Sequence, residues 1–270
     1  MHSVTDFADQ LAEPLSRTFA RGGTVLIPAF AVGRSQQVTL ALRRLMKRGA
    51  IPEVPIHIDS PMAVNATQIY SRHMNVRNLD ADVFEDGRLT LFPEHVELHR
   101  TVQDSMRLND LDGPRVILSA SGMMSGGRVL HHFRRLAPDR KNLVLFAGYQ
   151  AVGTRARAVL DGAGSVKIFG RHVPVRCDVL SLQGMSGHAD RDELLRWVQT
   201  AGPPPRVALL VHGEPAAAEA LAQRLRGVLG ITAITPDHGD AVDLAALVDE
   251  AAGAVDAAVA ASTEREAIAP

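Results

Sequence analysis

The sequence contains one cysteine, Cys177, and few aromatic residues. A single thiol excludes an internal disulfide framework and a cysteine-based zinc knuckle, and this usage is typical of a reducing cytoplasm. Phenylalanine, tyrosine and tryptophan make up only 4% of the chain, which argues against an aromatic platform that stacks single-stranded bases. We therefore expect a cytoplasmic protein without disulfides.

The sequence also lacks long apolar runs and an excess of either charge. No run reaches the ~20 residues of a membrane-spanning helix, and the N-terminal stretch MHSVTDFADQLAEPL lacks the basic start and apolar centre of a signal peptide. With 29 basic and 30 acidic residues the formal net charge is -1, so any anion binding must be local. The 270 residues are 46% hydrophobic, which is enough for two domains or one large one, and no membrane partner is expected.

Strand-like and helix-like segments alternate along the chain. Short apolar strands are expected at residues 24–30, 54–59, 115–121 and 142–149, helices at 6–21 and 35–48 and after Pro61 and Gly127, and short β-rich pieces at 166–182. Strands that alternate with helices predict an α/β fold with a largely parallel, covered sheet. Residues 241–270 are Ala-rich, and we interpret them as one amphipathic capping helix or a loose tail, with an oligomer contact as the sharper alternative.

His188 stands between a strand and a helix in QGMSGHADRDELLRW. Asp190 can cap the helix, and Glu193 completes a capping box. Bare N–H groups at a helix N-terminus favour anions, and a histidine beside a bound phosphate could protonate a leaving oxygen. The alternative is a loop histidine that bonds a backbone carbonyl.

His212 repeats the same arrangement in RVALLVHGEPAAAEAL, where Pro215 begins the helix. If the two strands are neighbours in one parallel sheet, both histidines emerge at the edge where open α/β sheets bind ligands. The pair therefore strengthens the functional interpretation of His188.

Several loops at strand ends carry glycine, serine and arginine, as in SASGMMSGGR at 119–128 and PAFAVGRSQQ at 28–37. Glycine lets backbone N–H groups approach a phosphate, and Arg128 or Arg34 could add a contact. Neither loop is a Walker loop or a nucleophile elbow. Such residues are also common in ordinary turns, so each loop alone is weak evidence.

Two histidine-containing stretches are given ordinary roles. HVELH at 95–99 has the spacing of a metal motif but not the H-E-x-x-H order or a surrounding helix, so it is not predicted to bind metal. LHHFRR at 130–135 is expected to be a solvated helix face.

Taken together, the motifs PAFAVGRSQ, IDSPMA, SASGMMSGGRVLHH, GYQAVGT, SGHAD and LVHGE occur in an order that resembles the β-CASP branch of the metallo-β-lactamase fold. These proteins process RNA. The resemblance covers roughly residues 6–244. It implies a β-CASP domain at 1–176, which consists of a parallel sheet flanked by helices. The C-terminal part of a metallo-β-lactamase αβ/βα domain would follow at 177–245, and an Ala-rich tail at 246–270.

The resemblance also implies roles for individual residues. His188 matches the family histidine that contacts the scissile phosphate and is implicated in protonating the leaving group. His212 matches a ligand of the second of two zinc ions, and relatives with histidine there generally act on RNA, so DNA is not an expected partner. The resemblance also implies, more loosely, that five further residues contact backbone phosphates in the substrate cleft. They are Arg34, Ser121, Gly122, Arg128 and Ser186.

One family feature is missing from the sequence. The metal motif H-x-H-x-D-H does not occur around any of the 11 histidines. A catalytic zinc needs about three protein ligands, so we expect an incomplete nuclease chain that is inactive alone. The competing hypotheses are a non-catalytic module that binds RNA or forms a homodimer, and an unrelated α/β phosphate-ester hydrolase, for which no metal or nucleophile set is found.

Overall fold

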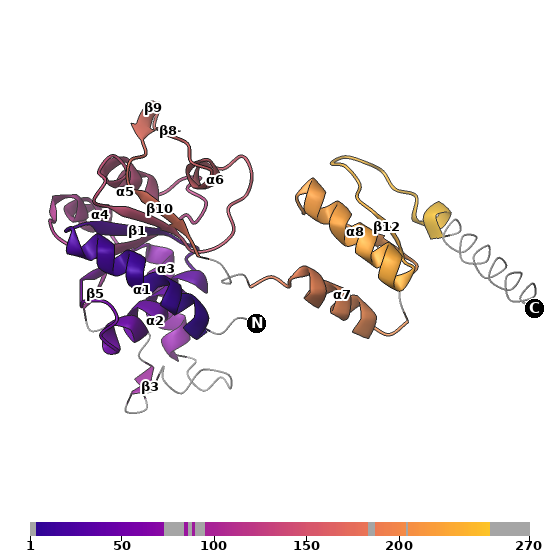
Figure 1. Ribbon diagram of the computed structural model, residues 1–270, viewed down its shortest axis with the longest axis horizontal. Helices are drawn as coiled ribbons and strands as arrows, with labels where there is room; N and C mark the ends of the chain where they lie inside the picture. Colours follow the sequence, from indigo (N-terminus) through magenta and orange to yellow (C-terminus); the bar gives the residue numbers. More distant parts are fainter. Residues whose placement is uncertain are drawn as a thin grey trace, which may run out of the picture. The chain divides into compact units, whose positions relative to one another are not determined.

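Six strands form one all-parallel sheet, in the order β10-β7-β1-β6-β2-β5. Figure 1 labels β1, β5 and β10 among these strands. The computed structural model describes residues 4–72, 84–85, 88–89, 95–182, 187–203 and 205–248. The strands are β1 (Thr24–Pro28), β2 (Ile56–Asp59), β5 (Val96–Leu98), β6 (Arg115–Ser119), β7 (Leu143–Phe146) and β10 (Asp178–Ser181). The predicted parallel sheet is confirmed.

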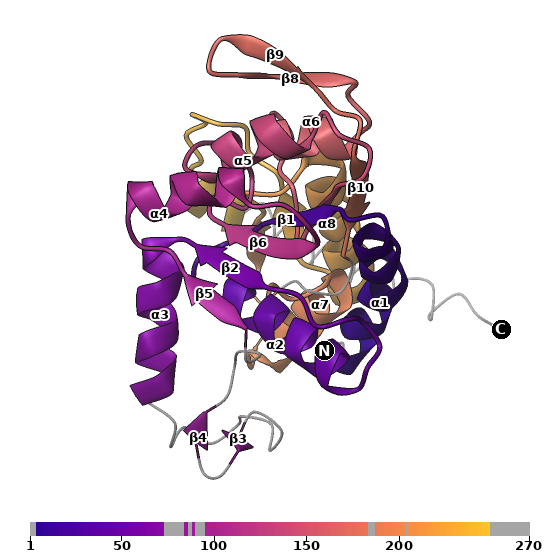
Figure 2. The same ribbon diagram turned by 90° about the vertical axis from the view of Figure 1, so that its left-hand side faces the viewer.

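Helices cover both faces of this sheet, as Figure 2 shows. On one face lie α1 (Val4–Ala20), α2 (Arg34–Lys47) and α3 (Pro61–Arg72); on the other lie α4 (Val102–Arg107), the 3-10 turn η2 (Leu108–Asp110), α5 (Val129–Leu136) and α6 (Arg155–Leu160). Each strand alternates between the two cores, since successive side chains point to opposite faces. Val25 and Ile27 of β1 pack in the core with α1 and α2, whereas Leu26 packs with α5 and α6.

Two small antiparallel pairs complete this part of the chain. The strands β3 (Phe84–Glu85) and β4 (Arg88–Leu89) pair with each other, as do β8 (Ser165–Ile168) and β9 (Arg171–Pro174). Neither pair joins the main sheet. The β-rich stretch predicted at 166–182 is thus a hairpin followed by an edge strand of the main sheet.

The chain divides into two compact units, Met1–Ser186 and Gly187–Pro270. The division falls after Ser186 because β10 pairs along its whole length with β7 and so belongs to the first unit. A family-domain boundary after Arg176 remains a prediction.

The second unit is a small parallel β–α–β arrangement preceded by a helix. It contains α7 (Arg191–Thr200), β11 (Val207–Leu209), α8 (Pro215–Leu229) and β12 (Thr232–Ile234), with β11 parallel to β12. Its core is small and is formed by Leu195, Ala222, Leu225, Ile231 and Ala233. The tail predicted at 246–270 lies, beyond Val248, outside the described residues.

No helix in the described part of the chain is both long and apolar enough to cross a membrane.

Candidate functional site

The loops at the carboxyl ends of the parallel strands are in close contact with one another. Gly122, after β6, is buried, and a Cβ atom there would lie 3.3 Å from the backbone nitrogen of Phe30 after β1. Arg34, at the start of α2, lies against Gly148 after β7, where a Cβ would be 3.6 Å from the arginine Nε. The predicted residues Arg34 and Gly122 are therefore at one edge of the sheet, where open α/β sheets bind ligands.

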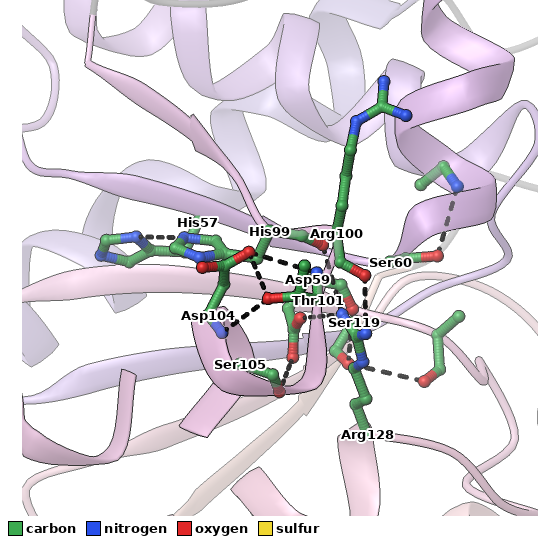
Figure 3. A network of polar contacts seen from close by, with 12 residues as sticks. His57, Asp59, Ser60, His99, Arg100, Thr101, Asp104, Ser105, Ser119 and Arg128 are labelled. Carbon is green, nitrogen blue, oxygen red and sulfur yellow. Dashed lines mark hydrogen bonds and ion pairs between the residues drawn. The ribbon is translucent and has the colours of Figure 1, made fainter. Parts of the chain in front are cut away.

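Asp59, the last residue of β2, is the centre of a buried polar network at this edge (Figure 3). Its carboxylate accepts hydrogen bonds from Ser105 Oγ at 2.6 Å and from Arg128 NH1 at 2.7 Å, and His132 Nε2 lies 2.7 Å away. Burial alone would raise the pKa of Asp59. The contacts with His132, Ser105 and Arg128 outweigh burial and hold this pKa below its ordinary value.

Arg128 is held by more than this ion pair. Its NH1 also donates to the carbonyl of His99 at 3.2 Å, and its NH2 donates to that of Arg100 at 2.9 Å. The guanidinium therefore joins the end of β2 to the loops after β5 and β6, and only 22% of the side chain is exposed. The structure gives Arg128 a positioning role; a contact with phosphate remains a prediction.

The Gly/Ser loop after β6 is fixed from the other side by Arg155 of α6. Arg155 NH1 donates to the carbonyls of Met124 and Ser125 at 3.2 and 3.1 Å, and its Nε donates to that of Lys167 at 2.9 Å. Gly127 has φ +83° and approaches the carbonyl of Ala120 so closely that a Cβ would be 3.0 Å away. Half-buried Ser121 lies within this fixed loop.

The guanidinium of Arg34 makes fewer hydrogen bonds to the described residues than those of Arg128 and Arg155 do. Its NH1 donates to Gln37 Oε1 at 3.2 Å, and its Nε is buried with no hydrogen-bond partner among the described residues. Burial lowers the pKa of this guanidinium from its ordinary value. Two exposed aromatic side chains stand on the loops that contact Arg34 and Gly122, Phe30 and Tyr149.

A pocket of about 780 Å³ lies between α4, α5 and the β8–β9 turn. The guanidinium carbon of Arg134 lies 5.7 Å from the ring centre of Phe169, and the ring of His131 is 4.6 Å from it. Burial, with the neighbouring charges of Arg134 and His132, lowers the pKa of His131. The other residues that line the pocket are Val102, Ser105, Met106, Asn109, Gly127, Arg128 and Arg135.

His188 is exposed and lies just before α7 in the second unit. The predicted capping box is confirmed: Asp190 accepts hydrogen bonds from the N–H groups of Asp192 and Glu193, both at 2.8 Å, and Glu193 accepts one from Asp190 N. Ser186, predicted to contact substrate, lies outside the described residues.

His212 is exposed between β11 and α8, and Pro215 begins that helix as predicted. Its φ of +67° is in the left-handed region that non-glycine residues rarely occupy. The strand before His188, β10, pairs with β7, and the strand before His212, β11, pairs with β12. That the two strands are neighbours in one sheet remains a prediction.

The potential metal ligands among the described residues do not gather around His212. Within the described ranges, one group of three potential metal ligands occurs, formed by His57, Glu97 and His99 in the first unit. His212 belongs to no such group, so the described residues do not assemble a catalytic zinc site there.

Comparisons with known proteins match two consecutive parts of the chain, and the second match begins within the first structural unit, before β10. The Beta-Casp domain matches residues 35–159, and the Zn-dependent metallo-hydrolase RNA specificity domain matches residues 172–236. The chain belongs to the β-CASP family. The second match contains both His188 and His212, and the first contains the polar edge around Asp59.

Relatives of this chain include a ribonuclease of Thermus thermophilus, TTHA0252, which is 39% identical over 206 residues; these cover 76% of this chain and 46% of the relative. The transcription termination factor FttA of Pyrococcus horikoshii is 35% identical over 87% of this chain and 37% of its own length. An RNase J-like protein of Methanocaldococcus jannaschii is 32% identical over 85% of this chain and 52% of its own length. The chain thus spans about half the length of these relatives or less.

Sequence patterns did not identify the Asp59 network. LHHFRR was expected to be a solvated face, but His132 and Phe133 are buried, and His132 contacts Asp59. The pattern L-x-H-F in a short helix, in a chain with an earlier strand that ends in aspartate, was the available signal. A buried histidine needs a polar partner, and Asp59 was a candidate.

Proposed function

We propose that this chain functions as part of a metal-dependent hydrolase that cleaves RNA phosphodiester bonds. In this proposal His188 protonates the leaving oxygen and His212 is one zinc ligand. The observation that carries the proposal is the RNA specificity domain of a Zn-dependent metallo-hydrolase at 172–236, which spans both histidines and follows a Beta-Casp domain. The relative named as a ribonuclease supports hydrolysis.

The carboxyl edge of the sheet is the proposed contact for RNA. Arg34 offers a guanidinium whose Nε has no partner in the described residues, beside the exposed rings of Phe30 and Tyr149. Arginine neutralises phosphates. The chain as a whole is poor in aromatic residues, but these two exposed rings can stack on bases without regard to sequence. Ser121, Gly122 and Ser186 are proposed to contribute further phosphate contacts.

In His188, an exposed imidazole stands before a capped helix. An imidazolium within hydrogen-bond reach of the leaving oxygen could transfer its proton as the phosphorus–oxygen bond breaks. Asp190 fixes the start of α7 and so positions the loop that carries His188.

Zinc, when bound in this family's site, supplies a hydroxide nucleophile and neutralises charge in the transition state. His212 alone does not hold such an ion, because a catalytic zinc needs about three protein ligands. We expect the 270-residue chain to bind RNA without cleaving it, and cleavage to require ligands additional to His212. A cytoplasmic location and a preference for RNA over DNA belong to the same proposal.

The second candidate is a module that binds RNA or forms a homodimer without catalysis. It is favoured by the lack of a zinc group around His212 in the described residues. A non-catalytic module that binds RNA shares this property with the first candidate, so binding alone does not separate the two; a module that only forms a homodimer predicts no RNA binding.

The test uses the purified 270-residue chain and a fluorescent single-stranded RNA of random sequence, with DNA of the same sequence as the control. We expect RNA to bind more tightly than DNA and to remain intact with zinc present. Equal affinity for both nucleic acids, or no binding, would contradict the proposed RNA contact. Zinc-dependent cleavage that is lost in His188→Ala would show that the chain needs no further ligands.

A further inference from the structure

Two histidines and a glutamate from neighbouring strands come together on one face of the sheet. His57 of β2 and Glu97 of β5 are register partners, and His99 follows two residues after Glu97, so its side chain points to the same face. The backbone N–H of His99 donates to the carbonyl of Ile58 at 3.0 Å and extends the pairing by one residue. This arrangement is independent of the second unit.

The possible ligand atoms of these side chains converge. His57 Nδ1 is 3.1 Å from His99 Nε2, as Figure 3 shows, and 3.4 Å from Glu97 Oε2; His99 Nε2 is 3.8 Å from Glu97 Oε2. Two ligand atoms that are each about 2.0–2.1 Å from one tetrahedral zinc lie roughly 3.3 Å apart. The three measured separations are close to this value.

We propose that His57, Glu97 and His99 form a binding site for a divalent transition metal of the zinc class. Two imidazole nitrogens and one carboxylate oxygen are a donor set that zinc uses with water as the fourth ligand. Imidazole also distinguishes this group from a calcium or magnesium site, which oxygen ligands would form.

The site is rigid where the imidazoles lie and open where the carboxylate lies. His57 and His99 are 1% and 9% exposed, whereas the side chain of Glu97 is 63% exposed. Arg128 NH1 donates to the carbonyl of His99 and so fixes the loop that carries this ligand. An ion can therefore enter past Glu97 and find both nitrogens already in place, with small loss of side-chain entropy.

Nearby charges are compatible with a cation. Arg115 is a cationic side chain that acts electrostatically on His57, and its guanidinium donates to the carbonyls of Gly113 and Leu111. Asp104 interacts electrostatically with His99 and would add negative charge beside a bound ion. His57 makes its polar contacts through Nδ1, since its buried Nε2 has no partner among the described residues.

The chain contains a matched control pair. Glu53 and His95 are also a carboxylate and an imidazole, with Oε2 and Nε2 3.7 Å apart, but both are exposed and no second histidine in the described part of the chain joins them. A general affinity of surface histidines for zinc would affect this pair as strongly as the proposed site. Glu53→Gln therefore removes a similar group without touching the site.

The experiment titrates the untagged 270-residue chain with Zn²⁺ by calorimetry, and with Co²⁺ by visible absorption. We expect one ion per chain, with the absorption of tetrahedral Co²⁺, and a rise in thermal midpoint because the ion binds the folded state. Glu97→Gln and His99→Gln should each weaken Zn²⁺ binding by more than about tenfold. Loss of a residue that only supports a metal ligand already lowers metal affinity by about tenfold or more.

Glu53→Gln and His212→Ala should keep wild-type affinity for the ion. The His212 variant separates this site from the zinc chemistry of the proposed function, so the two can fail independently. The proposal is overturned if the wild type binds no Zn²⁺, or if Glu97→Gln and His99→Gln bind it as tightly as the wild type. Circular dichroism of each variant shows that the fold is kept; a misfolded His99→Gln leaves Glu97→Gln, on an exposed side chain, to decide.

Discussion

Arg128 NH1 and Asp59 Oδ1 are 2.7 Å apart, and the Asp59 side chain is completely buried. The pair links the end of β2 to the start of α5, which are 69 residues apart in the sequence. Removing one member of a buried ion pair leaves the other charge without compensation, which costs more than the pair contributes.

Asp59→Asn should therefore lower the free energy of unfolding by about 3–5 kcal/mol, as measured by urea denaturation. It leaves the Arg128 guanidinium and His132 without their carboxylate. The control is Asp161→Asn, which removes the exposed ion pair with Arg157 and should cost less than about 1 kcal/mol. Equal effects of the two changes would show that the Asp59 network adds no stability.

The contact proposed for Arg34 can be read from the salt dependence of RNA binding. Arg34→Gln should weaken binding and make the slope of log affinity against log salt shallower by about 0.7, the value for one phosphate of a single strand. The control is Arg107→Gln, because Arg107 is exposed and its ion pair with Asp104 is long, at 3.5 Å. An unchanged slope in Arg34→Gln would place the RNA elsewhere.

Burial raises the pKa of the Cys177 thiol to about 11. Native protein should react slowly with a maleimide at pH 7, and protein unfolded in urea should react quickly, because the thiolate is the reactive form. Stability from this group is fully present below its ordinary pKa of 9.0 and is lost as pH rises toward 11.

Cys177→Ala tests this pH dependence. The wild type should lose thermal stability above pH 9 more steeply than the variant does. Parallel melting curves over that range, or rapid labelling of the native protein, would contradict a buried thiol.

Asp190 should stabilise the start of α7. Asp190→Ala should speed hydrogen exchange at the amides of Asp192 and Glu193, which lose their acceptor, and Asp190→Ser should restore protection in part. Asp192→Ala removes the exposed contact with Arg224 but leaves the cap, so it should have the smaller effect.

The same cap has a defined pH dependence. Hydrogen bonds from Glu193 N and Asp192 N hold the pKa of Asp190 below its ordinary value of 3.8. Its stabilising effect is present above pH 3.8 and is lost as pH falls through the lower folded value. Asp190→Ala and the wild type should therefore exchange alike in strong acid.

The elements that the sequence predicted best depend on local signals. β1, α2 and α5 follow from apolar periodicity and glycine stops, and the cap at Asp190 follows from side chains three residues apart. The contacts of Asp59 join residues between 46 and 73 positions apart, so they appear only when the sheet order is known. The pairing of β10 with β7 was missed for the same reason.

HVELH shows this limit most clearly. In the sequence, its two histidines are four residues apart, which is the spacing of a metal motif on a helix. In the structure Val96–Leu98 is a strand, so His95 pairs with Glu53 and His99 meets His57. The relevant neighbour was 42 residues away, across two parallel strands.

The central claim, that this chain serves an RNA-cleaving metallo-hydrolase, is tested most directly on the protein made in its own cells. The gene would be tagged at its 3′ end, and the native material purified and incubated with single-stranded RNA with and without a zinc chelator. We expect cleavage that the chelator stops and that His188→Ala abolishes while RNA binding is kept. Native material that binds RNA and cleaves none, with zinc supplied, would contradict the account and leave a non-catalytic RNA-binding module.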